Sequence, residues 1–339
     1  MTRVQSPDGV PTAENVEHYR MRAAGGVGLI ISEGTYVRGP AAGPFTGVPR
    51  FYGAESAAGW RNIVEAVHAE GAAMIPQLWH VGVDRGLTPQ LEPDLQTVSP
   101  SGLGFDGQPL GIALDDDGLA AIIASFAESA ALAQEIGFDG VELHGAHGYL
   151  LDQFMWAQTN HRTDEFGGSI ARRSAFPAAV VAAVRQAVGP DFAIVYRYSQ
   201  WKGTQFEARL ADEPAELEQI LAPLVDAGVD VFHVSTRRHW APGFEHVDDS
   251  IGLAGWTRKV TGRPVITVGS VGVDTVFRSE TEAPELTTGE RLEYLAEQFA
   301  AEQFDIVALG RALLADPAWV DKTRTGRADE IVPFLHRPR

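Results

Sequence analysis

Seven short apolar segments alternate with helical segments along the chain, and this alternation restricts the fold more than any other feature. The predicted strands are Val27–Gly34, Ala72–Trp79, Phe138–Gly145, Phe192–Ser199, Val229–Thr236, Pro264–Ser270 and Phe304–Gly310. Each is almost continuously hydrophobic, which is typical of parallel strands that are covered on both faces. We therefore expect an α/β fold built around a parallel sheet.

Amphipathic segments of helical period lie between these strands. The predicted helices are Thr12–Ala24, Glu55–Glu70, Asp115–Ile136, Ile170–Val188, Asp212–Ala227, Ile251–Val260 and Thr287–Glu302. Several end in a glycine directly before the next strand, where glycine can adopt the left-handed cap. This repetition, without a Pro/Ser-rich linker, favours a closed barrel over two unrelated domains. We predict one (β/α)8 TIM-barrel domain over residues 1–339, in which seven strands can be counted.

Composition excludes several classes of function. The 27 Lys and Arg against 45 Asp and Glu give a net charge of −18, which repels nucleic acid and anionic membranes. The chain has 0 cysteines, so disulfides, thiolate nucleophiles and iron–sulfur clusters are excluded. No apolar stretch approaches the ~20 residues of a membrane span, and the first residues are polar. We expect a cytoplasmic protein that acts on small molecules, with homo-oligomerisation left open.

Two histidines and a tyrosine follow the third predicted strand, in the motif His144-Gly-Ala-His147-Gly-Tyr149. In a barrel, active sites lie at the carboxyl ends of the strands, which is where this motif falls. The two imidazoles could ligate a metal, but no companion ligand pair is evident. They could instead donate hydrogen bonds to one carbonyl oxygen, with Tyr149 as a proton donor. Packing in the core is the third alternative.

Two polar residues within apolar strands point to a heterocyclic ligand. An unpaired arginine at Arg197 would be costly to bury, so it requires either a salt bridge to Glu142 or Asp139 or an anionic ligand edge. Gln77 needs partners for both its amide donor and its acceptor, and a heterocycle with N–H and C=O groups would supply them. Together the two residues suggest a flavin.

The last two predicted strands end in Val268–Ser270 and Leu309–Arg311. Barrels commonly hold phosphate in the loops after their last two strands, where glycine lets backbone N–H groups approach and a cation balances the charge. The alternative is that Gly269 and Gly310 merely turn the chain. Their occurrence on consecutive strands favours a phosphate site.

These residues together resemble the Old Yellow Enzyme family, which are FMN-dependent (β/α)8 ene-reductases. His144–Phe154 (HGAHGYLLDQF) and Thr159–Ser169 (TNHRTDEFGGS) carry the most specific likeness, and it extends over essentially the whole chain. The resemblance implies FMN contacts from Thr2, Gly34, Gln77, Arg197, Gly269, Ser270, Gly310 and Arg311. It also implies that His144 and His147 bind the substrate oxygen, that Tyr149 donates the proton and that Trp79 lines the substrate site.

By this resemblance the protein is an NAD(P)H-dependent flavin oxidoreductase. NADH or NADPH reduces the FMN and leaves, and an α,β-unsaturated carbonyl or nitro compound then takes a hydride and a proton across its C=C bond. One alternative is an incomplete, FMN-deficient barrel without activity. Another is a flavin-free, phosphate-binding isomerase or aldolase, against which the scarcity of lysine argues.

The resemblance also bears on the first barrel strand. Met1 and Thr2 match the residues just after that strand in the family, so seven strands leave open edges at Val27–Gly34 and Phe304–Gly310. We expect a gap there that exposes the apolar interior and the flavin site. We also expect the working protein to carry roughly 20–30 further residues before Met1, enough for a hairpin and one strand.

Overall fold

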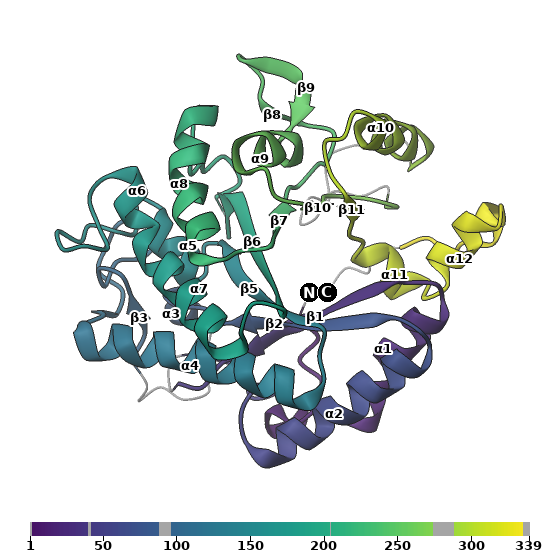
Figure 1. The fold of residues 1–339 in the computed structure, drawn as a ribbon, viewed down its shortest axis with the longest axis horizontal. Helices are drawn as coiled ribbons and strands as arrows, with labels where there is room; N and C mark the ends of the chain where they lie inside the picture. The colour runs from purple at the N-terminus through teal and green to yellow at the C-terminus, as the bar shows by residue number, and fades with distance from the viewer. Residues whose placement is uncertain (1, 40–41, 88–95, 204, 274–287, 335–339) are drawn as a thin grey trace.

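A curled sheet of parallel strands forms the centre of the molecule (Figure 1). The structure is a computed structural model that describes residues 2–39, 42–87, 96–203, 205–273 and 288–334. The sheet order is β1–β2–β5–β6–β7–β10–β11. The strands are β1 (Leu29–Tyr36), β2 (Ala73–Trp79), β5 (Gly140–His147), β6 (Ala193–Lys202), β7 (Val231–Ser235), β10 (Val265–Val268) and β11 (Ile306–Val307). This confirms the predicted α/β barrel with seven countable strands in the described part of the chain.

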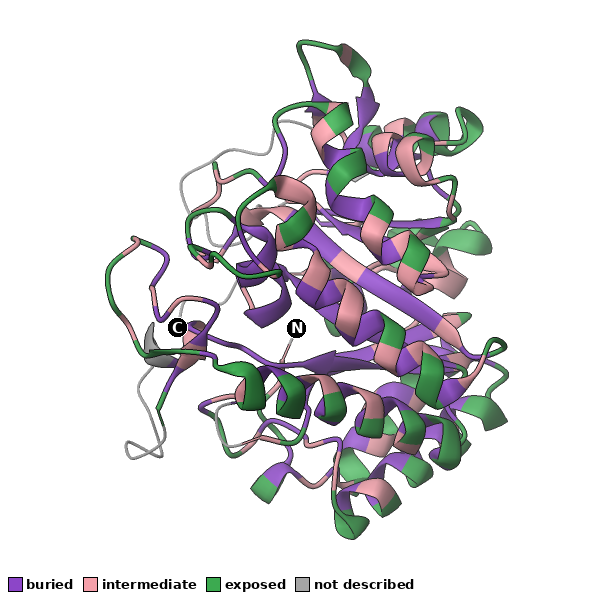
Figure 2. Ribbon diagram, turned by 60° about the vertical axis from the view of Figure 1, so that its left-hand side comes forward, coloured by how far each residue is buried: buried purple, intermediate pink, exposed green. Residues whose placement is uncertain are grey.

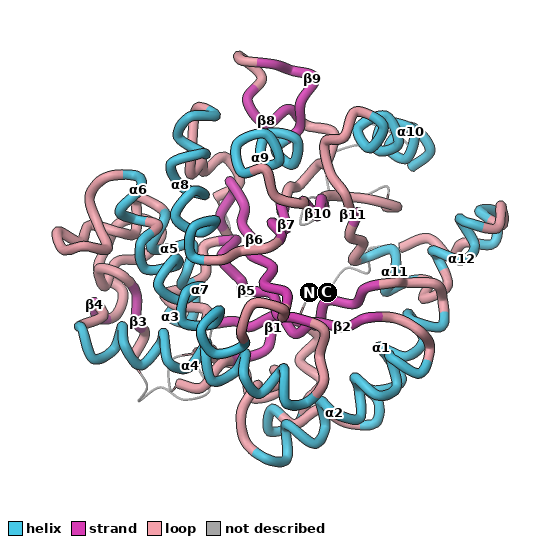
Figure 3. Tube along the Cα trace, viewed as in Figure 1, coloured by secondary structure: helices cyan, strands magenta, loops and turns pink. Residues whose placement is uncertain are grey.

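Helices surround the outer face of the sheet (Figure 3). The long ones are α1 (Ala13–Ala24), α2 (Ala54–Ala69), α4 (Asp116–Ile136), α7 (Ala175–Val188), α8 (Pro214–Ala227), α9 (Leu253–Thr261) and α10 (Thr288–Ala300). The helix expected at Ile170–Val188 is divided into α6 (Ile170–Arg173) and α7, because Pro177 lacks a backbone N–H and is tolerated only in the first turn of a helix. Thr287, the expected first residue of α10, and Met1 lie outside the described residues.

Shorter elements connect the barrel units. They are α3 (Asp84–Leu87), α5 (Leu150–Met155), α11 (Arg311–Ala315), α12 (Trp319–Arg324), two short 3-10 turns at Pro7–Gly9 and Ala328–Glu330, and two small sheets formed by β3 (Val98–Ser99) with β4 (Ile112–Ala113) and β8 (Pro242–Phe244) with β9 (Asp248–Gly252). Of these, α5 directly follows β5 and α11 directly follows β11, so both begin at the carboxyl end of the barrel.

Helix α4 matches the helix predicted at Asp115–Ile136 to within one residue, but it is more apolar than expected from the absence of a membrane-like stretch. It has 21 residues and is, by length and composition alone, able to cross a membrane. Phe126, Ala130 and Ala133 on this helix are fully buried in the main hydrophobic core, and the helix packs against α7. Its apolar residues therefore cover the barrel, as in the core helix of an ordinary α/β fold.

The sheet is open between β1 and β11 in the described residues, each of which pairs with one neighbour only. Figure 2 shows that the strands are mostly buried, whereas the outer faces of the helices are exposed. At the opening, however, Leu29 and Ile31 of β1 are only half-buried and Ile306 of β11 is 42% exposed. The predicted open edges are thus confirmed, and apolar side chains of the barrel interior reach the surface there.

Candidate active site

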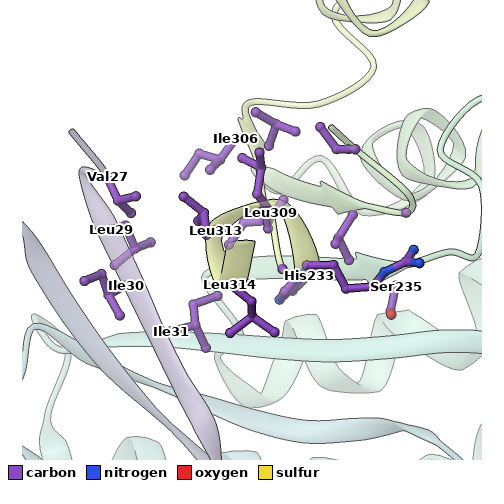
Figure 4. Close-up of a pocket in the computed structure, with 18 of the residues that line it drawn as sticks. Val27, Leu29, Ile30, Ile31, His233, Ser235, Ile306, Leu309, Leu313 and Leu314 are labelled. Atoms are coloured by element: carbon purple, nitrogen blue, oxygen red, sulfur yellow. The ribbon is translucent and has the colours of Figure 1, made fainter. Parts of the chain in front are cut away.

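A cavity of about 710 Å³ lies at the opening of the barrel. Figure 4 shows its apolar walls, with Val27, Leu29 and Ile31 on one side and Ile306 and Leu309 on the other. Its polar lining includes His147, Arg197, His233, Ser235, Gly269, Ser270, Gly310 and Arg311. The cavity therefore joins the carboxyl end of β5 and β6 to the turns that follow β10 and β11.

An imidazole and aromatic cluster lies beside this cavity at the carboxyl ends of β2 and β5. The ring centroids of His144 and His147 are 5.1 Å apart, and those of His144 and Tyr149 are 4.9 Å apart. Trp79 stacks on His144 at 6.1 Å and meets Tyr149 edge-on at 4.9 Å. The structure therefore brings together the four residues that the sequence analysis assigned to substrate binding and proton transfer.

The His144 imidazole is buried and that of His147 is half-buried, and both rings are neutral. Burial, followed by the charge of Arg197, lowers the pKa of His144 and of His147 well below the usual value. In His144, Nδ1 accepts the Ala146 N–H at 3.4 Å, which leaves the ring proton on Nε2. In His147, Nε2 lies 2.8 Å from the Ser235 hydroxyl oxygen. The cluster can thus offer the His144 Nε2–H to a ligand oxygen, and also the His147 Nδ1–H when the Ser235 hydroxyl donates to Nε2, without carrying a charge.

A buried carboxylate, Glu142 on β5, connects the polar residues beneath the cluster. Gln77 Nε2 donates to its Oε1 at 2.6 Å, and Nδ1 of His233 lies 2.6 Å from its Oε2. Burial alone would raise the pKa of Glu142, but His233, Arg197 and Gln77 lower it to about 2. Glu142 is therefore an anion at neutral pH, and it fixes the side-chain orientation of Gln77.

Arg197 meets neither of its two expected partners closely. Its Nη1 lies 4.0 Å from Glu142 Oε1, while Asp139 interacts instead with His68 and with the Met74 N–H. The Nη2 atom donates to Ser235 Oγ at 3.1 Å, whereas the buried Nε has no partner among the described residues. The guanidinium of this cavity-lining residue thus keeps an unused hydrogen-bond donor, which suits the polar edge of a ligand.

The turns after β10 and β11 meet at the other end of the cavity. Arg311 donates to Ser270 Oγ at 3.3 Å, and Ser270 has a left-handed backbone with φ 54°. A Cβ on Gly269 would collide with Thr236, whereas a Cβ on Gly310 would meet nothing within 4 Å. Only glycine fits the first position, and the second leaves open backbone beside a cation, which suits a phosphate group.

The remaining predicted FMN contacts lie at or near the cavity. A Cβ on Gly34 of β1 would collide with Trp79, so glycine lets the Trp79 ring and Gln77 Oε1 approach β1. Five of the predicted site residues lie beside the cavity and do not line it: Gly34, Gln77, Trp79, His144 and Tyr149. The Thr2 side chain is half-buried, and its neighbour Arg3 lines the cavity.

The chain's own residues fit a flavin mononucleotide. The buried Nε of Arg197 and Nε2 of His233 both lack partners among the described residues and belong to residues that line the cavity. A polar heterocycle would satisfy such atoms, which are costly to leave unpaired. At the other end, Ser270 and Arg311 suit a phosphate. In the described ranges, no group of three His, Asp or Glu side chains is placed to hold a metal ion.

Three further residues, Ser235, His233 and Trp201, belong to the site and were not predicted from the sequence. Trp201 stacks on His147 with ring centroids 4.3 Å apart, and its Nε1 donates to the Ser235 carbonyl. Ser235 ends the buried strand β7 and His233 lies two residues before it; polar residues in such a strand are a detectable signal, since barrel active sites lie at the carboxyl ends of the strands. Their partners lie 88 and 91 residues away, so the pairings themselves are visible only in the structure.

Comparisons with known proteins agree with this geometry. The family model of the NADH:flavin oxidoreductase / NADH oxidase family matches residues 1–330. The chain is 36% identical over 340 residues to an NADH oxidase of Thermoanaerobacter brockii, covering 97% of this chain and 48% of that protein. The chain thus spans about half the length of the first curated relatives that it matches.

Two solved structures share the fold. Morphinone reductase in complex with tetrahydroNAD superposes with a TM-score of 0.75 at 28% identity, over 100% of this chain and 87% of that one. The Old Yellow Enzyme homologue of Zymomonas mobilis gives a TM-score of 0.76 at 26% identity, over 96% and 87% of the two chains. This chain therefore belongs to the NADH:flavin oxidoreductase family of Old Yellow Enzyme-like barrels, which binds FMN and uses NAD(P)H.

Proposed function

We propose that the protein is an ene-reductase, in which NAD(P)H reduces FMN and the activated C=C bond of an α,β-unsaturated carbonyl or nitro compound is then reduced. The observation that supports this most is the cluster of His144, His147, Tyr149 and Trp79 beside a cavity that also contains Arg197. Two neutral ring N–H donors next to a phenol hydroxyl suit a carbonyl or nitro oxygen whose negative charge grows during reaction.

Bound FMN would supply the hydride chemistry, and Gln77, Arg197, Ser270 and Arg311 would hold it. His144 and His147 then bind the substrate oxygen and stabilise its developing charge; loss of one such donor typically costs ~2.7–4 kcal/mol. The Tyr149 hydroxyl donates the proton to the α-carbon. Trp79 packs against His144 and Tyr149, which restricts their rotation and covers one side of the substrate.

We further propose that residues 1–339 act as one FMN-binding barrel domain on small molecules in the cytoplasm. The net charge of −18 argues against nucleic acid or a membrane surface as a partner. Gel filtration would establish the oligomeric state, on which the sequence gives no expectation, and cell fractionation would test the location.

The direct test begins with the purified protein. A yellow sample that absorbs near ~450 nm, as oxidised flavin does, is expected, either as isolated or after reconstitution with FMN. Reduction of 2-cyclohexenone and of a nitroalkene should then be followed with NADH and with NADPH, and the two kcat/KM values decide between the donors. A colourless protein that takes up no FMN would contradict the proposal and favour an inactive or flavin-free barrel.

A further inference from the structure

Lys202 and Asp152 form an ion pair in the fully buried interior behind the histidine cluster. Lys202 Nζ lies 2.8 Å from Asp152 Oδ1, and both side chains are 0% exposed. The chain has few lysines, and this type of residue is almost never fully buried unless it is paired. Because burying two charges costs desolvation energy, such a pair is weak evidence for a role in stability. The pair therefore calls for another explanation.

The other hydrogen bonds of the pair lead to the turn that carries the site residues. Asp152 Oδ2 accepts the Gly148 N–H at 2.7 Å, between His147 and Tyr149. Lys202 Nζ donates to the Ser199 carbonyl at 2.9 Å, and Ser199 Oγ accepts the His147 N–H at 2.9 Å. The two charges thus hold the turn from both sides, one directly and one through Ser199.

This turn has a backbone that needs such support. His147 has φ 64° and Gly148 has φ 82°, both in the left-handed region, which costs a non-glycine residue about 1–2 kcal/mol. The backbone of Lys202 is also the register partner of His147, and the Gly203 N–H donates to the His147 carbonyl at 2.8 Å. The position of the His147 ring against Trp201 depends on this conformation.

We propose that Asp152 and Lys202 are positioning residues that hold the His147–Tyr149 turn in the conformation that binds the substrate oxygen. This inference rests on the proposed function, because it assumes that His147 and Tyr149 contact the substrate. The pair acts through the Gly148 N–H and the Ser199 carbonyl and touches no reacting atom. Its removal should disturb oxygen binding and proton donation more than it disturbs FMN binding.

Double variants distinguish a role of Asp152 and Lys202 in positioning the turn from a role in the stability of the fold. Removal of one partner leaves a buried charge unpaired, whereas replacement of both by apolar residues is often neutral for stability. D152L/K202M removes both charges and the acceptor of the Gly148 N–H. D152N/K202M removes the charges and keeps that acceptor. The control is R185M/D230L, which removes a more exposed ion pair, between Arg185 and Asp230, near the opposite end of β6.

The readouts are the melting temperature, the Kd of FMN, the Kd of a phenol and the two half-reactions in stopped-flow. For D152L/K202M we expect a phenol Kd raised ~10-fold and enone reduction slowed ~10²-fold, with the Kd of FMN within about twofold of the parent. D152N/K202M should recover most of the phenol affinity. The control should lose thermal stability alone.

Phenol affinity and enone reduction equal to the parent in D152L/K202M would overturn the inference. If that variant does not fold, K202R and K202M decide: the arginine, which keeps a cation beside Asp152, should preserve phenol binding, and equal loss in both would overturn the inference. A parent protein that binds phenol but reduces no enone contradicts the proposed function, while the phenol measurements still test the positioning role.

Discussion

The Ser235 hydroxyl oxygen lies 2.8 Å from Nε2 of His147 and 3.1 Å from Nη2 of Arg197. One side chain on β7 therefore connects the imidazole assigned to the substrate oxygen with the guanidinium assigned to the flavin. The motif His144-Gly-Ala-His147-Gly-Tyr149 includes His147, but its partner Ser235 lies on another strand, far away in the sequence. The connection makes Ser235 a sensitive position for both ligands.

Replacement of Ser235 by alanine should weaken both sides of this connection. Loss of a hydrogen bond to a charged group costs about 1.5–3 kcal/mol, so we expect the Kd of FMN or of a phenol to rise ~10-fold or more. Titrations followed by flavin absorbance would measure both. S235T keeps the hydroxyl and should stay near the parent; equal loss in S235A and S235T would contradict a role for the hydroxyl.

Tyr149 should matter in only one half-reaction. If its hydroxyl donates the proton, Y149F should leave flavin reduction by NAD(P)H nearly unchanged and slow enone reduction by ~10²–10⁴-fold. Stopped-flow of each half-reaction provides the measurement. Similar slowing of both would show that Tyr149 supports the site in general and is not the proton donor.

His144 and His147 should act as a unit, because their rings lie 5.1 Å apart and would share one ligand oxygen. Each alanine variant should weaken phenol binding, and the double variant should lose less than the sum of the two losses. A double-mutant cycle on the phenol Kd tests this. Strict additivity, or release of a stoichiometric metal on mutation, would instead favour separate roles or the metal alternative.

Arg311 should bind the phosphate of FMN and should contribute nothing to binding of the flavin ring. R311A should therefore raise the Kd of FMN by about 10–100-fold, as expected for a lost charged hydrogen bond, and leave the Kd of riboflavin nearly unchanged. Binding of the two flavins to the apoprotein can be compared by fluorescence quenching. An equal effect on riboflavin would place Arg311 in a structural role.

Glu142 should make the stability of the protein sensitive to acid. Its pKa is lowered from 4.5 to about 2, so its contribution is fully present above pH ~4.5 and is lost as the pH falls toward 2. In urea unfolding, the stability difference between the parent and E142Q should shrink as the pH is lowered from 6 to ~3; a difference independent of pH would show that the carboxylate charge is not involved.

The sequence predicted the sheet well, because each strand of a covered parallel sheet is a continuous apolar run that needs no distant partner to be recognised. The last strand was less well defined: β11 is Ile306–Val307, within the expected Phe304–Gly310, since its side toward β1 has no neighbour among the described residues. The cluster of His144, His147 and Tyr149 was predictable because a single turn carries all three residues. The contacts of Glu142 with His233 and of Lys202 with Asp152 join different strands and helices, and no local pattern indicates them.

The opening between β1 and β11 implies that the cofactor would also stabilise the fold. The predicted contacts to the flavin ring come from β1, β2 and β6, whereas the predicted phosphate contacts follow β10 and β11. One FMN molecule would therefore connect the two edge strands of the sheet across the gap. A ligand at 100 times its Kd adds ~2.7 kcal/mol of stability to the state that binds it. Strands β10 and β11 contain few residues. The local stability of this part of the barrel therefore depends most on bound FMN.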